Sequence, residues 1–318
     1  MKRSGAKIVI FTILICILAF PVSAAKTLIP GGQVVGMQLM DDTVSVAAID
    51  EDLGRAARSA GLQPGDRIVS IDGKKVCCPE DIRSVLSQSD GCITLRILRD
   101  GKEKELSFCP TATENGPRLG VYLKEGTTGI GTITYYDPDR RNFGALGHGV
   151  NDPAGKLLNL RTGSIYEASV LSVRKGKAGT PGQLMGTITA PDALGELSKN
   201  TARGVFGTTA IPTAEPLPLG QAKTGSATIR STVSGSGIRE YSVEILKIYP
   251  HADASGRNLL IRVTDPDLLN ATGGIVQGMS GSPIIQDGKL VGAVTHVLVN
   301  DPTTGYGIFI ENMLDTAA

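Results

Sequence analysis

The segment Gln277-Gly278-Met279-Ser280-Gly281-Ser282-Pro283-Ile284-Ile285 sets a serine between glycines, three residues before a proline that opens an apolar strand. Glycine accepts the sharp backbone turns that aim neighbouring N–H groups at one point. Ser280 is therefore a candidate nucleophile, and the N–H groups of Gly278 and Ser280 are candidates for the oxyanion hole of an acyl-transfer reaction. A lone G-x-S-G string is a weak signal, because glycine–serine loops are common.

The string Gly-Met-Ser-Gly-Ser-Pro resembles the Gly-Asp-Ser-Gly-Gly-Pro loop of trypsin-like serine proteases. Met279 occupies the acidic position of that loop. In the trypsin-like enzymes this acid pairs with a newly cut N-terminus, so we do not expect activation by that route here.

A nucleophilic serine needs a base, and the chain has three histidines. His148 lies in F-G-A-L-G-H-G-V, residues 143–150, where glycines on both sides let its side chain project into a cleft. It precedes Ser280, which is the chain order of trypsin-like barrels. We therefore expect His148 to be the base, His296 to shape the site and His251 to lie on the surface. A structural histidine with satisfied hydrogen bonds is the ordinary alternative for each.

The third member of a triad orients the imidazole. Asp265 follows the apolar strand 259–263 and precedes Pro266, where a carboxylate could face a cleft. The alternative is an N-cap for the short turn 267–269. Sequence spacing does not decide between the two, because trypsin-like enzymes place their aspartate much further before the serine.

Short apolar stretches bounded by Gly, Pro or Asp recur through residues 119–318, and Gly makes up 40 of the 318 residues. This spacing predicts strands in an all-β barrel or sandwich. The clearest of these stretches are residues 130–135, 170–173, 241–248 and 259–263. A helical pattern is restricted to residues 192–199 and the C-terminal end.

Residues 53–73, LGRAARSAGLQPGDRIVSIDG, predict a short helix ending at Gly61, a Pro-Gly turn and a strand closed by Asp-Gly. A second helix is expected at 80–86, and residues 93–97 alternate as a strand that returns at 105–108. This block, residues 31–110, resembles a PDZ domain of exported proteases. Residues 111–118, TATENGPR, are polar and are expected to form a linker.

The PDZ resemblance implies that a glycine-bearing loop offers backbone N–H groups to the C-terminal carboxylate of a peptide, which adds as a strand. Here that loop would contain Val35, Gly36, Met37 and Gln38. A small β-sandwich without a ligand is the alternative.

The N-terminus carries Lys2, Arg3 and Lys7 before an uncharged run at 8–20, followed by Pro21 and the small residues of V-S-A-A. This pattern predicts that residues 1–25 form an export signal, cleaved or kept as a membrane anchor. A buried hydrophobic strand is the alternative. The working domains would then act outside the cytoplasm.

Composition excludes several classes of partner. Lys+Arg 32 against Asp+Glu 31 gives no basic excess, and aromatic residues are 4% with no Trp, so we expect no nucleic-acid partner. There is no metal-ligand cluster, phosphate loop or dinucleotide fingerprint, so we expect no metal and no cofactor. Four cysteines lie in the exported part, and we favour free thiols over a single disulfide, for which three pairings exist. They are Cys77, Cys78, Cys92 and Cys109.

The export signal, the PDZ-like block, F-G-A-L-G-H-G-V, V-T-D-P-D-L-L and residues 272–297 occur in an order that resembles the stage IV sporulation protein B (SpoIVB) serine peptidase family of endospore-forming bacteria. The resemblance implies a mainly β, trypsin-like serine endopeptidase with His148, Asp265 and Ser280 as its triad. It also implies secretion from the forespore into the space between the forespore and mother-cell membranes. There the family cleaves a regulatory membrane protein, which releases an intramembrane metalloprotease and activates a late sigma factor.

Two other functions stay open from the sequence. A non-catalytic exported scaffold could carry the PDZ-like block on an inactive barrel. An esterase is less favoured, because the G-x-S-x-G elbow of α/β-hydrolases needs a strand–turn–helix setting that this sequence lacks.

Overall fold

The chain folds mainly into β-strands, as expected from its glycine-rich spacing. The computed structural model describes residues 26–89, 91–152, 155–251 and 256–317. The predicted export segment, residues 1–25, lies outside these ranges. Within them, no helix is both long enough and apolar enough to span a bilayer.

A first barrel closes because strand β2 pairs with β11 on one edge and with β9 on the other. The remaining neighbours pair in turn, so six strands form a ring. In ring order the strands are β9 (Val121–Asp137), β10 (Asn142–Ala145), β13 (Gly204–Thr209), β12 (Gln183–Thr201), β11 (Leu160–Arg174) and β2 (Val34–Ile49). Strand β1 (Thr27–Pro30) pairs with β9 and with the short β14 (Leu217–Pro218).

A second closed barrel follows in the chain. Its strands, in ring order, are β15 (Gly225–Ser231), β16 (Arg239–Ile248), β17 (Leu259–Val263), β20 (Asp301–Phe309), β19 (Lys289–Leu298) and β18 (Pro283–Gln286). Helices α3 (Pro266–Thr272) and α4 (Ile310–Ala317) flank it. Its apolar core also takes in Val34, Val170 and Leu184 of the first barrel, so the two barrels bury one continuous surface.

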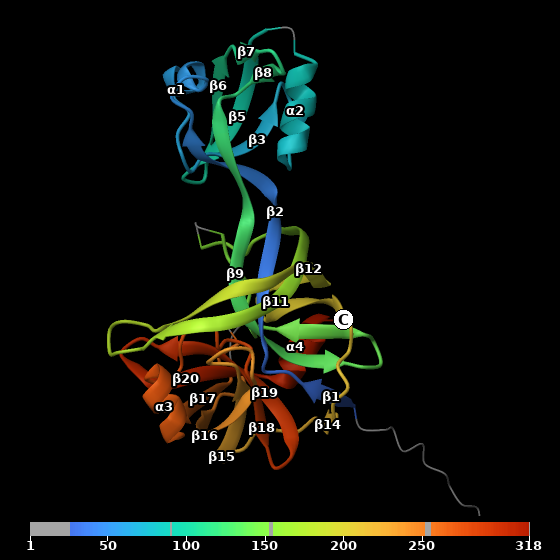
Figure 1. Cartoon of the computed structure of the whole chain (residues 1–318), viewed down its shortest axis with the longest axis vertical. Helices are drawn as coiled ribbons and strands as arrows, with labels where there is room; N and C mark the ends of the chain where they lie inside the picture. The colour runs from blue at the N-terminus through green and yellow to red at the C-terminus, as the bar shows by residue number, and fades with distance from the viewer. Residues whose placement is uncertain (1–25, 90, 153–154, 252–255, 318) are drawn as a thin grey trace, which may run out of the picture.

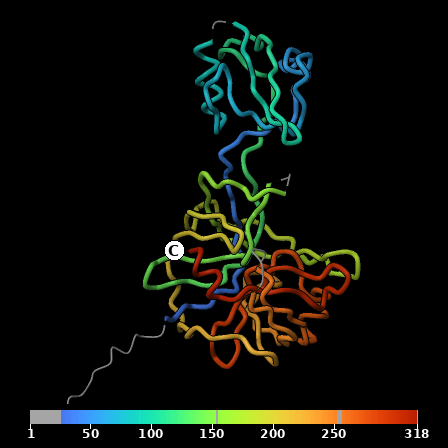
Figure 2. The backbone as a smooth tube through the Cα atoms, turned by 180° about the vertical axis from the view of Figure 1, so that it is seen from behind, coloured from blue at the N-terminus to red at the C-terminus, as the bar shows by residue number. Residues whose placement is uncertain are grey.

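A third unit is inserted between β2 and β9, with its own apolar core that includes Ile68, Ile82 and Leu95. Its elements are α1 (Arg55–Ser59), β3 (Arg67–Ile71), β4 (Lys74–Lys75), α2 (Pro79–Ser87), β5 (Ile93–Arg99), β6 (Lys102–Phe108), β7 (Thr111–Thr113) and β8 (Gly116–Arg118). Figure 1 shows it above the barrels, joined to them by β2 and β9, and the view from behind in Figure 2 shows the same two connections.

The β2–β9 ribbon stays paired as it leaves the barrel, but it is irregular at the junction. Leu39 pairs with Thr127 and Val44 with Glu125, so four residues of β2 lie opposite Gly126 alone. Gly126 has φ +58°, and a Cβ there would overlap the carbonyl oxygen of Leu39. Glycine is therefore required where the ribbon turns towards the inserted domain.

Three sequence expectations need correction. The PDZ-like block does not begin at residue 31, because residues 34–39 are barrel strand and the inserted unit's own pairing begins at Val44, opposite Ile68. Residues 111–118 form the β7–β8 hairpin rather than an unstructured linker. Residues 192–199 lie in strand β12, because pairing with β11 and β13 overrides their helical pattern.

The preference for free thiols is also wrong for one pair. Cys92 and Cys109 form a disulfide, because they flank β5 and β6, whose register pairs Ile93 with Phe108. Cys77 and Cys78, beside the start of α2, are free. The expected helices at 80–86 and at the C-terminus are present as α2 and α4.

Candidate active site

The Ser280 loop belongs to the second barrel but is held by the first. Thr132 of β9 donates from Oγ1 to the Gly278 carbonyl at 2.7 Å, and its N–H donates to the Ser280 carbonyl at 3.2 Å. Gly281 has φ +97°, and a Cβ there would overlap the carbonyl oxygen of Thr132. Only glycine fits so close an approach, which is why the serine is followed by one. Met279, at the position of the acid in trypsin-like loops, is fully buried in the barrel core.

The backbone N–H groups of this loop divide into two sets. Those of Met279, Gly281 and Ser282 donate to the main chain, at 3.1, 2.8 and 3.0 Å. Those of Gly278 and Ser280 have no acceptor within the described part of the chain. Two unused donors at these positions are what an oxyanion hole requires. This arrangement is compatible with the prediction that the N–H groups of Gly278 and Ser280 form the oxyanion hole.

His148 follows β10 through a tight turn in which Leu146 and Gly147 both have φ +68°. A Cβ at Gly147 would press on Thr295 and Ile308 of the second barrel, so the turn lies directly against that barrel. Nδ1 of His148 lies 2.9 Å from the carbonyl oxygen of Gly149. Burial lowers the pKa of His148 below its usual 6.5, although that hydrogen bond opposes the shift.

His296 of β19 lies beside His148, with 5.1 Å between the ring centroids. Burial, the neighbouring His148 and Arg257 together lower the pKa of His296 to about 4. Its Nδ1 is buried and has no hydrogen-bond partner within the residues that the structure describes. His296 therefore lies beside the predicted base as a neutral ring. His251, by contrast, is exposed, as expected.

One cavity of about 510 Å³ brings Ser280, His148, His296 and Gly278 together. The first barrel contributes one wall and the second barrel the other. The wall residues include Met37, Leu39, Ile130, Ile275, Val276, Val297 and Val299. No Asp, Glu, Lys or Arg side chain lines the cavity within the described ranges.

Asp265 is not among the residues that line this cavity. It is the N-cap of α3: its carboxylate accepts from the N–H of Leu268 at 3.0 Å and from that of Ser242 at 3.2 Å. The expectation that Asp265 orients His148 is corrected by this arrangement, in which the N-cap alternative is realised. In its place, the Gly149 carbonyl is the group that contacts Nδ1 of His148.

The predicted peptide-binding loop is also wrong. Val35, Gly36, Met37 and Gln38 lie within β2, where β9 and β11 occupy both strand edges, so no peptide can add there. Met37 lines the active-site cavity instead.

The inserted domain has its own groove of about 940 Å³, between α2 and the first residues of β9. Ile82 and Leu86 form one side, and Leu119, Val121 and Leu123 form the other. Sequence reasoning missed it, although R-L-G-V-Y-L, residues 118–123, combines a glycine turn with alternating apolar residues.

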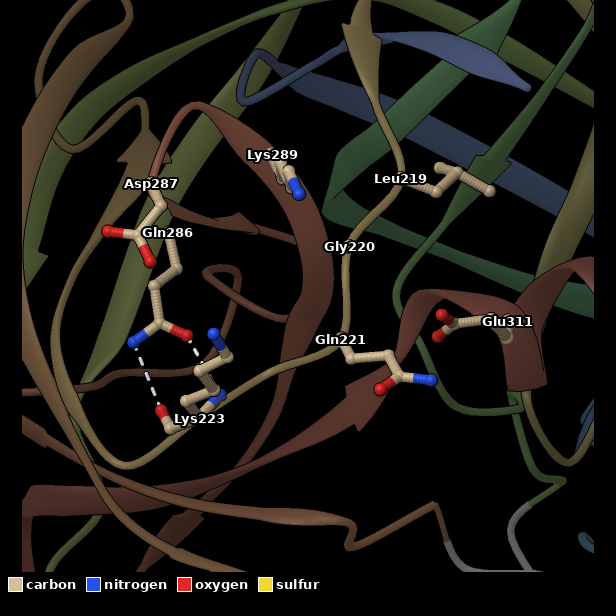
Figure 3. Close-up of a pocket in the computed structure, with 8 residues that line it drawn as sticks. All are labelled: Leu219, Gly220, Gln221, Lys223, Gln286, Asp287, Lys289 and Glu311. Atoms are coloured by element: carbon tan, nitrogen blue, oxygen red, sulfur yellow. Dashed lines mark hydrogen bonds between the residues drawn. The ribbon is translucent and has the colours of Figure 1, made fainter. Parts of the chain in front are cut away.

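A separate cavity of about 420 Å³ lies beside α4 and the β18–β19 turn and contains none of the predicted site residues. Figure 3 shows Gln286 of β18 hydrogen-bonded to Lys223, which lies in the segment before β15. Its Oε1 accepts from the N–H of Lys223 at 2.8 Å, and its Nε2 donates to the Lys223 carbonyl at 3.0 Å. Gln286 therefore fixes this connection between the barrels.

The chain matches two family models: SpoIVB peptidase S55 over residues 115–314, and PDZ domain over residues 52–99. The second match falls within the inserted domain. The first spans β9 to α4 and includes every cavity residue except Met37 and Leu39 of β2.

Among curated proteins, one from Rhizobium meliloti (strain 1021), named as a zinc metalloprotease, is 33% identical over 171 residues, which are 52% of this chain and 43% of the relative. A similarly named protein of Agrobacterium fabrum is 44% identical over 78 residues, 24% of this chain and 21% of the relative. The chain thus spans less than half the length of these relatives.

Among solved structures, the active form of the Rv3671c protease of M. tuberculosis is 16% identical with a TM-score of 0.36, covering 60% of this chain and 75% of that one. The match to the peptidase model, by contrast, extends over well over half of the 318 residues. The protein therefore belongs to the SpoIVB peptidase S55 family and carries a PDZ domain.

Proposed function

We propose that the protein is a serine endopeptidase in which Ser280 is the nucleophile and His148 the general base. The observation that carries the proposal is that both side chains line one cavity between the two barrels, beside the unused N–H groups of Gly278 and Ser280. Each barrel supplies one of the two groups, so a peptide bound between the barrels meets both.

The contact to Gly149 sets the protonation of the base. A carbonyl oxygen only accepts hydrogen bonds, so Nδ1 of His148 carries the proton and Nε2 carries the free lone pair. Nε2 takes the proton of the Ser280 hydroxyl as Oγ attacks the peptide carbonyl. The resulting oxyanion accepts from Gly278 and Ser280 N–H, a contribution of about 3 kcal/mol per donor. His148 then protonates the leaving amine, and water releases the acyl group.

The cavity also limits the substrate. Its walls are largely apolar, and no charged side chain of the described residues lines it. A charged substrate side chain would lose its hydration there without gaining a partner, which is unfavourable. We therefore propose that an uncharged, apolar residue precedes the bond that is cut.

The PDZ groove is the proposed site for a peptide C-terminus. Within the described chain, residues 121–125 of β9 pair only with β2, so their other edge is open towards α2 for an added strand. Arg83 and Arg118 line the groove and are suited to a carboxylate.

The biological setting rests on the family and on the N-terminal sequence. We propose secretion across, or anchoring to, the forespore membrane by residues 1–25, and action in the space between the forespore and mother-cell membranes. The substrate would be a regulatory membrane protein of an intramembrane metalloprotease complex, whose cleavage triggers activation of a late sigma factor. Self-processing near the N-terminus belongs to the same proposal.

The test treats the full-length chain with a fluorophosphonate probe, beside Ser280→Ala and His148→Ala. We expect labelling of the wild type, none of Ser280→Ala and strongly slowed labelling of His148→Ala. Co-expression with the candidate membrane substrate then reports cleavage by its change in mass. Labelling of Ser280→Ala equal to that of the wild type would exclude Ser280 as the nucleophile.

A further inference from the structure

A side chain of the PDZ domain contacts the loop that follows His148. Arg67, the first residue of β3, places Nη1 3.1 Å from Oδ2 of Asp152. The Asp152 side chain is 7% exposed and that of Arg67 is 26% exposed. An ion pair therefore joins the inserted domain to the first barrel, in addition to the β2–β9 ribbon.

Asp152 lies four residues after His148 and organises this loop. Its Oδ1 accepts from the N–H of Lys156 at 2.9 Å, and its own N–H donates to the Lys156 carbonyl at 2.7 Å. Asn151 and Leu157 form an isolated β-bridge just outside these bonds. Lys156 and Leu157 are therefore tied back to residues 151–152, so their position follows that of Asp152.

The two ends of the same loop, Val150 and Leu158, are held by a residue of the first barrel. Asn200 of β12 accepts from the N–H of Val150 at 2.9 Å and donates to the carbonyls of Val150 and Leu158, both at 2.8 Å. Asn200 thus holds the loop at its base, and Arg67 holds it at Asp152.

Arg67 itself is held at the domain junction. Its Nη2 donates to Oγ1 of Thr43 at 3.1 Å and lies 3.8 Å from Oδ2 of Asp41. Both partners belong to the irregular part of β2 opposite Gly126. A rotation of the PDZ domain about this part of the ribbon would therefore move Arg67 relative to the barrel that carries Asp152.

Because the Asp152 side chain is buried, breaking its ion pair with Arg67 is energetically costly. Loss of the Arg67 cation removes one charged partner of this buried carboxylate, which favours movement of the group towards water. Movement of Asp152 would strain the short segment that leads back to Gly149, whose carbonyl contacts Nδ1 of His148. Small displacements of a catalytic group have large effects on rate.

We propose that Arg67 is a positioning residue for the peptidase reaction, through which the orientation of the PDZ domain sets the position of the His148 loop. The inference rests on the proposed role of His148 as the base. It assigns the PDZ domain a direct structural link to the active site, separate from any peptide that its groove binds.

The test compares Arg67→Met, Arg67→Lys and the control Arg96→Met in the full-length chain. Met keeps much of the aliphatic bulk of Arg67 without charge, and Lys keeps the charge. Arg96 is a PDZ arginine whose side chain contacts Ser70 and Glu103, both within that domain. We expect Arg67→Met to lower kcat about 10- to 100-fold with KM little changed, since loop position and not substrate contact is altered. Arg67→Lys should recover most of this loss, and Arg96→Met should match the wild type.

Amide hydrogen exchange over residues 148–158 supplies a readout that does not need activity. Exchange should be faster in Arg67→Met than in the wild type and Arg96→Met. Unchanged kcat and exchange in Arg67→Met, or a rise in its kcat, would overturn the proposal. If Arg67→Met does not fold, Arg67→Lys decides, with a kcat slightly below and an exchange slightly faster than those of the wild type expected. A wild type that does not react with fluorophosphonate would refute the proposed function, whereas the exchange result would still test the link.

Discussion

The hydroxyl of Ser280 donates a hydrogen bond of 2.7 Å to the main-chain carbonyl of Thr295. Thr295 belongs to β19 of the same barrel, whereas His148 belongs to the other barrel. Thr132 of the first barrel holds the serine loop at both Gly278 and Ser280. In the proposed mechanism, the Ser280 side chain turns away from Thr295 and towards His148.

The pH dependence of the reaction should reflect the buried base. His148 works as a base only when it is neutral, and burial lowers its pKa below 6.5. As pH falls, the neutral form therefore persists below 6.5. We expect the acidic limb of kcat/KM to have its midpoint below pH 6.5, measured with a peptide substrate across pH 4–8.

A control separates this effect from unfolding. His296 has a folded-state pKa of about 4, against 6.5 for an ordinary histidine. Between these values the unfolded chain binds more protons, so stability falls as pH falls through this window. Activity must recover fully when samples return to pH 7. A reversible midpoint above pH 6.5 would contradict the assignment of His148.

Gly281 should be the least replaceable glycine of the serine loop. Gly281→Ala places a Cβ against the carbonyl oxygen of Thr132, whereas Gly288→Ala has the same left-handed strain, with φ +71°, but open space around it. We expect Gly281→Ala to lose about 1–3 kcal/mol more of its free energy of unfolding than Gly288→Ala, by urea denaturation. It should also lose fluorophosphonate labelling, because the Ser280 loop must shift. Equal stability of the two variants would show that Thr132 does not hold the loop in this way.

Two substitutions test whether Asp265 is a helix N-cap or a member of a catalytic triad. Asparagine caps helices as well as aspartate does, whereas alanine does not and costs about 1 kcal/mol. From its contacts to Leu268 and Ser242, we expect Asp265→Asn to keep both the wild-type melting temperature and the wild-type kcat. Asp265→Ala should lower the melting temperature without a selective loss of kcat.

The opposite result would restore the triad. Changing a triad aspartate to asparagine costs about 10⁴-fold in kcat. Such a loss in Asp265→Asn, with an unchanged melting temperature, would mean that α3 moves to bring this carboxylate to His148 in the active enzyme.

Sequence patterns correctly predicted those helices and strands whose formation depends on residues close together in the chain. The alternation of Ile93, Leu95 and Ile97 and the apolar face of α2 need only their own residues. The G-M-S-G-S-P loop likewise has a glycine at 281, where the backbone takes a φ of +97°.

Long-range pairing was the part that could not be predicted. The strand V-V-G-M-Q-L has the same alternation whether its neighbours belong to a PDZ domain or to a barrel, so the insertion between β2 and β9 was missed. Asp265 illustrates the same limit, since an aspartate before proline suits an N-cap and a cleft equally well. Only the position of Ser242 and Leu268 distinguishes them.

The disulfide should stabilise the PDZ domain in particular. Cys92 and Cys109 are separated by 17 residues, and closing a loop of this size contributes about 3 kcal/mol in the chain-entropy account. We expect Cys92→Ser to lower the stability of this domain by about that amount, while the free Cys77→Ser has little effect. Hydrogen exchange of β5 and β6, compared with the barrel strands, would localise the loss. Equal loss in both variants would indicate a packing effect instead.

The uncharged cavity leads to a prediction about the residue that precedes the cleaved bond. In peptides that differ only there, we expect Leu, Val or Met to be cleaved with a higher kcat/KM than Lys or Asp, because the cavity offers a charge no partner among the described residues. One or two methylenes in an apolar pocket account for about 10- to 200-fold, so a difference of at least that order is expected. Val297→Asp is the matched test, since it places a carboxylate in the cavity wall and should raise the relative rate for Lys. A wild-type preference for Lys or Arg would mean that an acid reaches this cavity when substrate binds.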